Sequence, residues 1–357
     1  MPNKNREVDF SYQRFFIGID VHKKSWKVTV RTNHMELKTF SMNPQPEELV
    51  KHLHKNYSNG EYLSVYEAGF CGYWIDKQLR QHGIQNIVVN AADVPSKGKE
   101  KVNKDDIIDS RKLARELENG TLRGIYVPDD YSEGIRTLCR LRYSLTKEQT
   151  RIKTRIKSFL AYYGKQLPEN YELNSWSGNF INYLEAMEFN QANSKQTLKH
   201  LIEELKDKKQ RLAKIIKELR DSTREAGLGT KIKQLMSIPG VSFITAITFY
   251  TEIIDMCRFK RLDELCSFVG LVPATYSSGN KERVLGLTNR QSKYLRYLIL
   301  ESSWAAIRSD PALTMRFGEL TQKMVKQKAI LRIAKKLLNR MRYVWLNDSE
   351  YIKAIVE

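Results

Sequence analysis

Acidic side chains stand in this sequence at places where an apolar environment would make them costly. Asp20 ends the run FIGID, and Glu67 interrupts the apolar run SVYEAG. A buried carboxylate is destabilising unless a cation or hydrogen bonds compensate for it. Further along, Asp106 and Asp109 are three residues apart in KDDIIDSRKLA, a spacing that directs both to one face of a helix. Asp105 falls on a different face, and Asp106 is preferred over it because of the spacing to Asp109.

Convergence of these four acids would create a site for divalent metal ions. Asp20 and Glu67 are expected to end two strands of one sheet, whose strands lie about 4.8 Å apart. Carboxylates that close together repel unless they are neutralised, and Mg²⁺ prefers carboxylate and water oxygens. Two such ions can activate a nucleophile and stabilise the leaving oxygen of a phosphodiester. Taken alone, Asp106 and Asp109 are also typical first-turn acids, and His22, considered as a fifth ligand, is typical of a turn.

A second candidate for chemistry is the serine pair in the stretch PATYSSGNKERVLG. A serine hydroxyl is a weak nucleophile at neutral pH and needs a base or a metal ion. All six histidines precede residue 201, so no Ser-His-Asp arrangement is visible near Ser278. By local pattern, Ser277 and Ser278 are typical of a turn before Gly279. If either serine is a nucleophile, activation by a metal ion fits the sequence better than a hydrolase triad.

The elements expected to position the acids come first in the chain. Apolar alternation predicts a β-hairpin over 15–31, and helical spacing begins at Pro46. Further strands are predicted at 37–41, 62–68 and 85–91, and a second helix at 72–83. The order is β-β-β-α-β-α-β, three antiparallel strands followed by α/β units. This is the order of ribonuclease-H-like (RuvC-like) domains, so we expect an α/β domain at 1–128.

The sequence after Pro128 is predicted to be all-α. Long charged segments with periodic Leu and Ile predict two helices, 132–164 and 195–226, in an antiparallel or intermolecular coiled coil. The stretch 231–253 predicts a helix, a Pro-Gly turn and a second helix. This resembles a helix-hairpin-helix element, whose turn amides can hold a DNA phosphate, although an ordinary αα turn fits as well. We therefore expect a helical oligomerisation region at 129–228 and a mostly helical domain at 229–357.

A formal charge of +19 indicates a polyanionic partner, nucleic acid first and an anionic membrane second. No apolar run approaches the roughly 20 residues that span a bilayer, and the first residues lack the apolar centre of a signal peptide. Scattered cysteines favour a reducing cytoplasm. The stretch 322–343 has eight Lys and Arg residues, no acid and an apolar stripe, as in a helix that faces phosphates. The candidate nucleic-acid-binding residues are Lys281, Arg283, Arg290, Lys293, Arg296, Lys323, Lys326, Lys328, Arg332, Lys335, Lys336 and Arg340.

Several motifs follow one another in order over about nine tenths of the chain. They read IGIDVHK, YEAG, KDDIIDSRKLA, SIPGVSFITA, FVGLVPATYSSG and YLRYLILESSW. Together they resemble the DEDD transposases of bacterial insertion sequences. That family joins a RuvC-like N-terminal domain to a C-terminal transposase domain with a catalytic serine. Members studied as bridge-RNA-guided recombinases use a structured noncoding RNA to pair donor DNA with target DNA.

The resemblance implies a function and assigns roles to residues. The metal-binding tetrad would be Asp20, Glu67, Asp106 and Asp109, and the nucleophile would be Ser278. Mg²⁺ would be the cofactor, with Mn²⁺ as a substitute. Ser278 would attack a DNA phosphodiester, leaving a phosphoserine link and a free 3′-hydroxyl for strand exchange. The family further implies a bridge RNA, dimers that assemble into tetramers, and a location in the bacterial cytoplasm at the nucleoid.

This sequence departs from the family pattern in two places. Lys104 is followed by Asp105 and Asp106, where the family often has Lys-Thr before the Asp-x-x-Asp pair. Ser242 stands where glycine often follows the Pro-Gly turn, which bears on phosphate binding rather than on the chemistry. Two other functions compete with the recombinase: a RuvC-like Holliday-junction nuclease that uses water, and a nucleic-acid-binding scaffold without catalysis.

Overall fold

Contacts within the chain divide it into two units, Met1–Val127 and Pro128–Glu357, each with its own core. The structure is a computed structural model that describes residues 9–95, 106–167, 176–278, 281–287 and 292–353. For Asp106 and for residues 273–278 and 281–287, the backbone alone is described. Within these ranges, no helix combines the length and the apolar character that crossing a bilayer requires.

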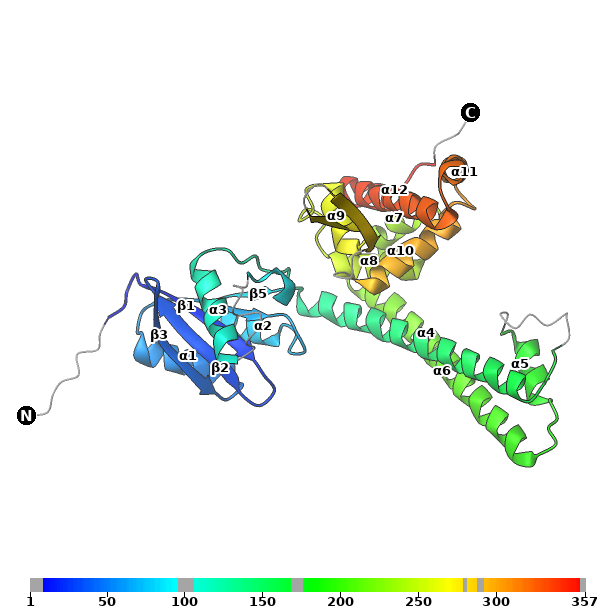
Figure 1. The fold of residues 1–357 in the computed structure, drawn as a ribbon, viewed down its shortest axis with the longest axis horizontal. Coiled ribbons are helices and arrows are strands. Elements are labelled where there is room, and N and C mark those ends of the chain that lie inside the picture. The colour runs from blue at the N-terminus through cyan, green and yellow to red at the C-terminus, as the bar shows by residue number, and fades with distance from the viewer. Residues whose placement is uncertain (1–8, 96–105, 168–175, 279–280, 288–291, 354–357) are drawn as a thin grey trace, which may run out of the picture. The chain divides into compact units, whose positions relative to one another are not determined.

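The first unit is a mixed sheet with helices on both faces (Figure 1). Its strands are β1 (Arg14–Val21), β2 (Trp26–Thr32), β3 (Met35–Met42), β4 (Glu61–Glu67) and β5 (Gln85–Val89). Its helices are α1 (Pro46–Asn56), α2 (Trp74–Gln81), the single 3₁₀ turn η1 (Ala91–Asp93) and α3 (Asp106–Glu118). The predicted order of three strands followed by alternating helices and strands is confirmed.

The sheet has the strand order β3-β2-β1-β4-β5. β1, β2 and β3 pair antiparallel, whereas β4 runs parallel to both β1 and β5. The parallel arrangement follows from the intervening helices, because a parallel connection needs a crossover. The C-terminal ends of β1 and β4 therefore meet at one edge of the sheet.

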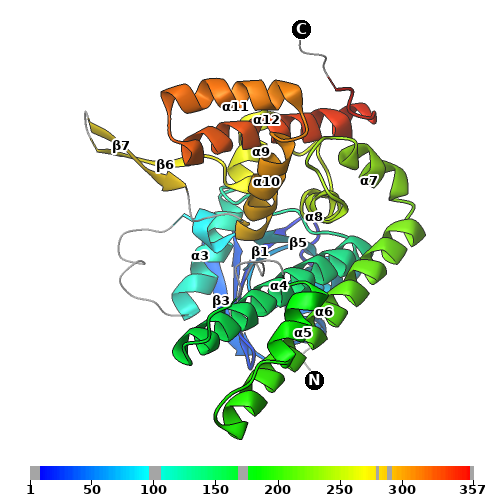
Figure 2. The ribbon, with the colours of Figure 1, turned by 90° about the vertical axis from the view of Figure 1, so that its right-hand side faces the viewer.

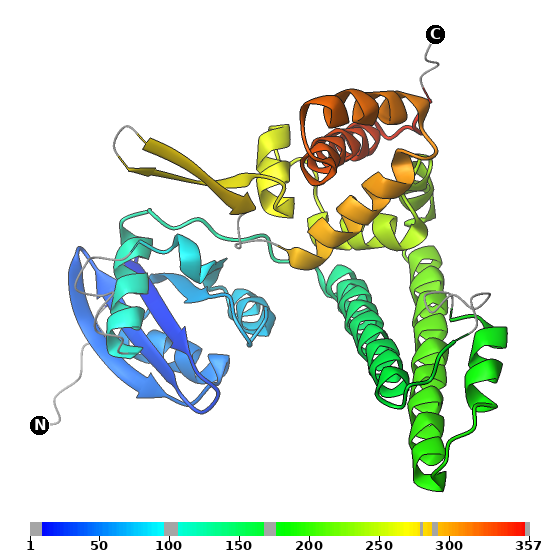
Figure 3. The same ribbon diagram turned by 45° about the vertical axis from the view of Figure 1, so that its right-hand side comes forward.

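The two faces of the sheet carry different helices. Phe15, Ile17 and Ile19 alternate along β1 and are fully buried in a cluster with Leu49 of α1 and Ile75 of α2. The intervening residues of β1 face the other side, where α3 crosses the sheet (Figure 3). Any acid of β1 at an even position therefore points to the α3 face.

The second unit is largely helical. Its helices are α4 (Asp130–Tyr162), α5 (Gly178–Glu185), α6 (Ala192–Glu225), α7 (Gly229–Met236), α8 (Phe243–Ile253), α9 (Leu262–Val269), α10 (Lys293–Ala306), α11 (Pro311–Lys323) and α12 (Lys326–Asn347). A hairpin of β6 (Pro273–Ser278) and β7 (Lys281–Leu287) separates α9 from α10. The chain is thus mixed α/β and mostly helical, as expected. The β6–β7 hairpin, however, corrects the prediction that the sequence after Pro128 is all-α.

The two long helices are confirmed, and they pair within one chain. Ile135, near the start of α4, shares a cluster with Leu219, near the end of α6. Ile156, near the end of α4, shares another cluster with Ile202, in the first third of α6. The helices are therefore antiparallel. Their first cluster also contains residues of α7 to α12, so this end of the pair belongs to the core of the C-terminal helices.

The predicted helix–turn–helix over 231–253 is confirmed as α7 and α8. Ser242, the residue that departs from the family pattern, begins α8 as its N-cap. Its Oγ accepts a hydrogen bond from the backbone N–H of Thr245 at 3.3 Å. The serine therefore satisfies one of the helix's own free amides, as N-cap residues do.

The stretch around the serine pair is a strand and not the loop that its turn residues suggest. Ser277 pairs with Glu282 and Ser278 with Lys281 across the β6–β7 hairpin. Gly279 and Asn280 between the strands lie outside the described residues. Ser277 and Ser278 are therefore the last two residues of β6, so the prediction of a turn at these serines was off by one or two positions.

The basic stretch 322–343 is not one helix. α11 ends at Lys323, and Met324 has extended backbone angles (φ −154°, ψ 161°) before α12 begins. The chain reverses here, so that α11 packs beside α12 (Figure 2). Ile330 and Leu337 of the predicted apolar stripe are buried, but Val325 is 60% exposed because it precedes the helix.

Candidate active site

Asp20 and Glu67 lie at the same edge of the sheet. The parallel pairing of β1 with β4 runs up to Ile19 and Tyr66, and Asp20 and Glu67 are the next residues in that register. Side chains at one register position of neighbouring strands point to the same face. Ile19 and Tyr66 point to the face that α1 and α2 cover, so the next residues, Asp20 and Glu67, point to the opposite face, which α3 covers.

The direction of α3 brings its first turn to this edge. At the end of α3, Glu118 forms an ion pair with Arg31 at 2.9 Å, and Arg31 pairs with Phe16 near the start of β1. In the middle of α3, Ser110 Oγ forms a hydrogen bond with Thr29 Oγ1 of β2 at 2.9 Å. α3 therefore runs antiparallel to β1, and its start lies near the end of that strand.

Lys112 connects two of the predicted acids. Its Nζ lies 3.1 Å from Asp109 Oδ1 and 3.9 Å from Glu67 Oε1. The lysine side chain is 11% exposed, whereas those of Asp109 and Glu67 are about one third exposed. One ammonium group thus lies within ion-pair distance of a carboxylate on α3 and a carboxylate on β4. The spacing Asp-x-x-Lys on a helix is the signal that could have identified Lys112.

The remaining two acids of the predicted tetrad are Asp20 and Asp106. Asp20 Oδ2 lies 3.0 Å from His22 Nε2, and the Asp20 side chain is 22% exposed. His22 lies between β1 and β2, as the predicted turn histidine should, and its ring also contacts an acid of the site. Asp106 is the first residue of α3, where only its backbone is described, and Asp105 lies outside the described residues.

The donor set at this edge suits a hard divalent cation. Carboxylates come to it from β1, β4 and α3, and two of them already share a positively charged group. Among the side chains that the structure describes, no three His, Cys, Asp or Glu residues converge closely enough to hold an ion by themselves. Asp106, whose side chain is not among them, begins the helix turn that ends in Asp109. Oxygen donors of this kind are those that Mg²⁺ and Mn²⁺ accept.

Ser278 belongs to the second unit, as the last residue of β6. Lys281 pairs with it across the hairpin, and Arg283 pairs with Tyr276. These two cations are placed by backbone alone, and Arg290 lies outside the described residues.

The other predicted nucleic-acid-binding residues lie on α10, α11 and α12. Their exposed members are Lys293, Lys323, Lys326, Lys328, Arg332 and Lys336, and the half-buried ones are Arg296, Lys335 and Arg340. On α12, Ile330 and Leu337 are buried, whereas the cations Lys328, Arg332 and Lys336, each four residues from the next, are exposed. This gives α12 one apolar face and one cationic face, an arrangement that suits phosphate contacts.

Arg340 has a structural partner. Its NH1 lies 2.7 Å from Oδ2 of Asp310, and the Asp310 side chain is 3% exposed. Asp310 Oδ1 also accepts a hydrogen bond from the backbone N–H of Leu313 at 2.9 Å and so caps α11. The guanidinium stacks on Tyr351, with 4.8 Å between its Cζ and the ring centroid. These contacts compensate the charge of Arg340 inside the second unit, which distinguishes it from the exposed cations of α12.

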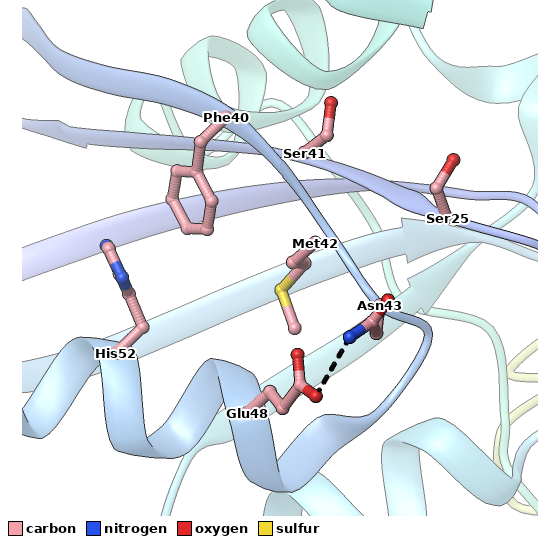
Figure 4. A pocket seen from close by; sticks show the side chains of 7 residues that line it. All are labelled: Ser25, Phe40, Ser41, Met42, Asn43, Glu48 and His52. Carbon is pink, nitrogen blue, oxygen red and sulfur yellow. Dashed lines mark hydrogen bonds between the residues drawn. The ribbon is translucent and has the colours of Figure 1, made fainter.

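A hollow on the surface of the first unit is lined mainly by residues of β3 and α1 (Figure 4). Its lining includes His52, whose ring lies 4.2 Å from that of Phe40, and Glu48, whose Oε1 accepts a hydrogen bond from Asn43. Burial, together with Lys38 and Lys55, lowers the pKa of His52. None of the predicted catalytic residues lines this hollow.

Comparison with known protein families gives two matches. Residues 17–164 match a model of DEDD transposases of the IS110 type, and residues 232–317 match the Transposase IS116/IS110/IS902 family. The first match contains the four acids, and the second contains Ser278.

Individual relatives are more distant but extend over much of the chain. A putative transposase of Sinorhizobium fredii is 26% identical over 82% of this chain and 72% of its own length. The transposase for insertion sequence element IS1533 of Leptospira borgpetersenii is 25% identical over 92% of this chain and 96% of its own. The transposase for insertion sequence element IS1111A of Coxiella burnetii is 26% identical over 67% of this chain and 65% of its own length. With both family models matched in order along the sequence, this chain belongs to the IS116/IS110/IS902 family of transposases.

Proposed function

We propose that this protein is a DNA recombinase of a bacterial insertion sequence, which cleaves and exchanges DNA strands with the four acids and Ser278. The observation that carries the proposal is the meeting of Asp109 from α3 and Glu67 from β4 around one positive charge. Asp20 ends the strand beside β4. The strand order β3-β2-β1-β4-β5, with three antiparallel strands, supports a RuvC-like fold for this catalytic domain, at 1–128.

Asp20, Glu67, Asp106 and Asp109 would hold Mg²⁺, with Mn²⁺ as a substitute. The bound metal would supply activation of a nucleophile and stabilisation of the leaving oxygen. The contribution of the chain is to hold the carboxylates on two strands and one helix, elements that fix their positions.

Ser278 is the proposed nucleophile. Its Oγ loses a proton and forms a bond to the DNA phosphorus, while the bond from phosphorus to the 3′-oxygen breaks and that oxygen takes up a proton. The products are a phosphoserine link and a free 3′-hydroxyl. When a 3′-hydroxyl of another strand attacks the phosphoserine, the phosphodiester is restored and Ser278 is released, so the number of phosphodiester bonds is conserved.

The nucleic-acid partners would be donor and target DNA and a structured noncoding bridge RNA. The exposed cations of α12 support phosphate contacts. The region 129–228 would mediate dimers that assemble into tetramers, and the domain 229–357 would present Ser278. A DNA substrate of this kind implies a place at the bacterial nucleoid in the cytoplasm.

Cleavage of DNA that carries the ends of the element tests the proposal, with RNA transcribed from the flanking noncoding region and with Mg²⁺. Asp20→Asn and Asp109→Asn are expected to lower the rate at least about a hundredfold, because charge stabilisation by metal is lost. Glu36→Gln is the control, since Glu36 of β3 pairs with Arg111 of α3. Wild-type cleavage in both Asn variants would contradict the proposal.

A further inference from the structure

Lys112 is an unusual neighbour for a metal site. A carboxylate set that binds a divalent ion gains from every negative charge, and a lysine within reach of two of its members opposes that gain. The Lys112 side chain is nevertheless nearly buried and lies closer to Asp109 than to Glu67, at 3.1 and 3.9 Å. A long, flexible side chain is held there at a cost in rotamer entropy, which the two ion pairs offset.

The ammonium group of Lys112 reduces the repulsion between the carboxylates of Glu67 and Asp109. Glu67 and Asp109 come from different elements, so repulsion between them would push α3 away from β4. A cation between them removes that repulsion. A divalent ion bound by the same two carboxylates would lie next to the ammonium group, and the two positive charges would repel each other.

We propose that Lys112 is a positioning residue that serves as a built-in counter-ion: it neutralises Glu67 and Asp109 when no metal ion is bound and competes with the metal ion for the same oxygens. Metal binding would displace the ammonium group, which has the length and rotatable bonds to withdraw. The inference rests on the proposed function, because it requires that the tetrad binds a metal ion.

Two measurements on the full chain test this proposal, with Lys112→Met as the main variant. Met has a similar length but no charge, so the packing around the stem of residue 112 is retained. Arg111→Met is the matched control, because Arg111 precedes Lys112 on α3 and pairs with Glu36 instead. The first measurement is calorimetric titration with Mn²⁺ alone, and the second is thermal unfolding in excess chelator.

We expect Lys112→Met to bind Mn²⁺ about tenfold more tightly than the wild type, because a competing positive charge is gone. In chelator, the same variant is expected to unfold at a lower temperature than Arg111→Met, and added Mn²⁺ should restore it. Equal or weaker Mn²⁺ binding by Lys112→Met would overturn the proposal.

An Asp20→Asn variant separates this failure from failure of the metal site. If Asp20→Asn loses Mn²⁺ binding while Lys112→Met binds as the wild type does, the tetrad stands and the role of Lys112 is overturned. If neither the wild type nor Lys112→Met binds Mn²⁺, the metal site and the competition are both overturned. If Lys112→Met alone binds, the competition is supported directly.

Discussion

Gly18 and Ser110 approach each other so closely that a Cβ atom on Gly18 would lie 2.1 Å from the Ser110 carbonyl oxygen. This contact joins the middle of β1 to the middle of α3. It therefore sets how near the first turn of α3, with Asp109, can come to Asp20 at the end of the same strand.

Gly18→Ala is expected to force α3 away from the sheet. The obstructing atoms are backbone, including the Ala114 nitrogen at 2.5 Å from the added Cβ, so rotation of a side chain cannot relieve the overlap. Overpacking of this kind costs about 1–3 kcal/mol or more. Chemical denaturation checks this, with Gly69→Ala as a control because the nearest atom to its Cβ position lies 4.0 Å away. Unchanged unfolding of Gly18→Ala would contradict the close packing.

The ion pair of Arg340 with Asp310 predicts a loss of stability on truncation. Arg340→Ala leaves the nearly buried Asp310 carboxylate without its cation, and breaking a buried pair typically costs about 3–5 kcal/mol. Lys336→Ala, four residues earlier on an exposed site of α12, is expected to change the free energy of unfolding by less than about 0.5 kcal/mol. Comparable denaturation midpoints for the two variants would contradict a structural role for Arg340.

The exposed cations of α12 are expected to contact phosphates. Lys328→Ala and Lys336→Ala should each weaken DNA binding across sequences and lower the slope of log affinity against log salt by about one. The measurement is fluorescence anisotropy over a series of salt concentrations. Lys51→Ala on α1 is the control, an exposed lysine outside the predicted set. A salt slope that stays at the wild-type value in both α12 variants would remove this helix from the interface.

Acid is expected to weaken the start of α4. Asp129 caps this helix, and its Oδ1 accepts a hydrogen bond from the backbone N–H of Ser132 at 2.8 Å, which lowers the pKa of Asp129. A lowered pKa in the folded state means that the stabilisation is present above the ordinary pKa near 4 and is lost as the pH falls through the lowered value. Asp129→Ala should therefore lower stability by about 1 kcal/mol at pH 7 and by less at about pH 3. A difference that grows on acidification would contradict this sign.

Much of the first unit was predictable because its strands alternate and its helices have apolar stripes. The edge at which Asp20 and Glu67 meet follows from strand order, and the sequence indicates that order through the crossover helices. The spacing of Lys112 from Asp109 was readable in the sequence, but its contact with Glu67 was not, because that contact depends on how near α3 lies to β4. The direction of α3 likewise depends on Arg31 and Glu118, which are far apart in the sequence.

The long helices of the second unit were predictable, but the point at which the chain turns back between α11 and α12 was not. The break at Met324 has no glycine or proline nearby, and the packing of α11 against α12 overrides the continuous helical pattern. The β6–β7 hairpin did have a signal, because Gly279-Asn280 between two strand-like runs is typical of a two-residue hairpin loop. The pairing of Arg340 with Asp310 joins two helices and could not be read from either alone.

The central claim, that Ser278 is the nucleophile, is tested most directly by trapping a covalent adduct. The full chain is incubated with element-end DNA, the flanking RNA and Mg²⁺, then denatured and analysed for DNA that remains attached to protein. We predict an adduct in the wild type and in Ser277→Ala, and none in Ser278→Ala, with cleavage lost together with the adduct. Wild-type cleavage by Ser278→Ala without any adduct would contradict the account and would indicate that water is the nucleophile.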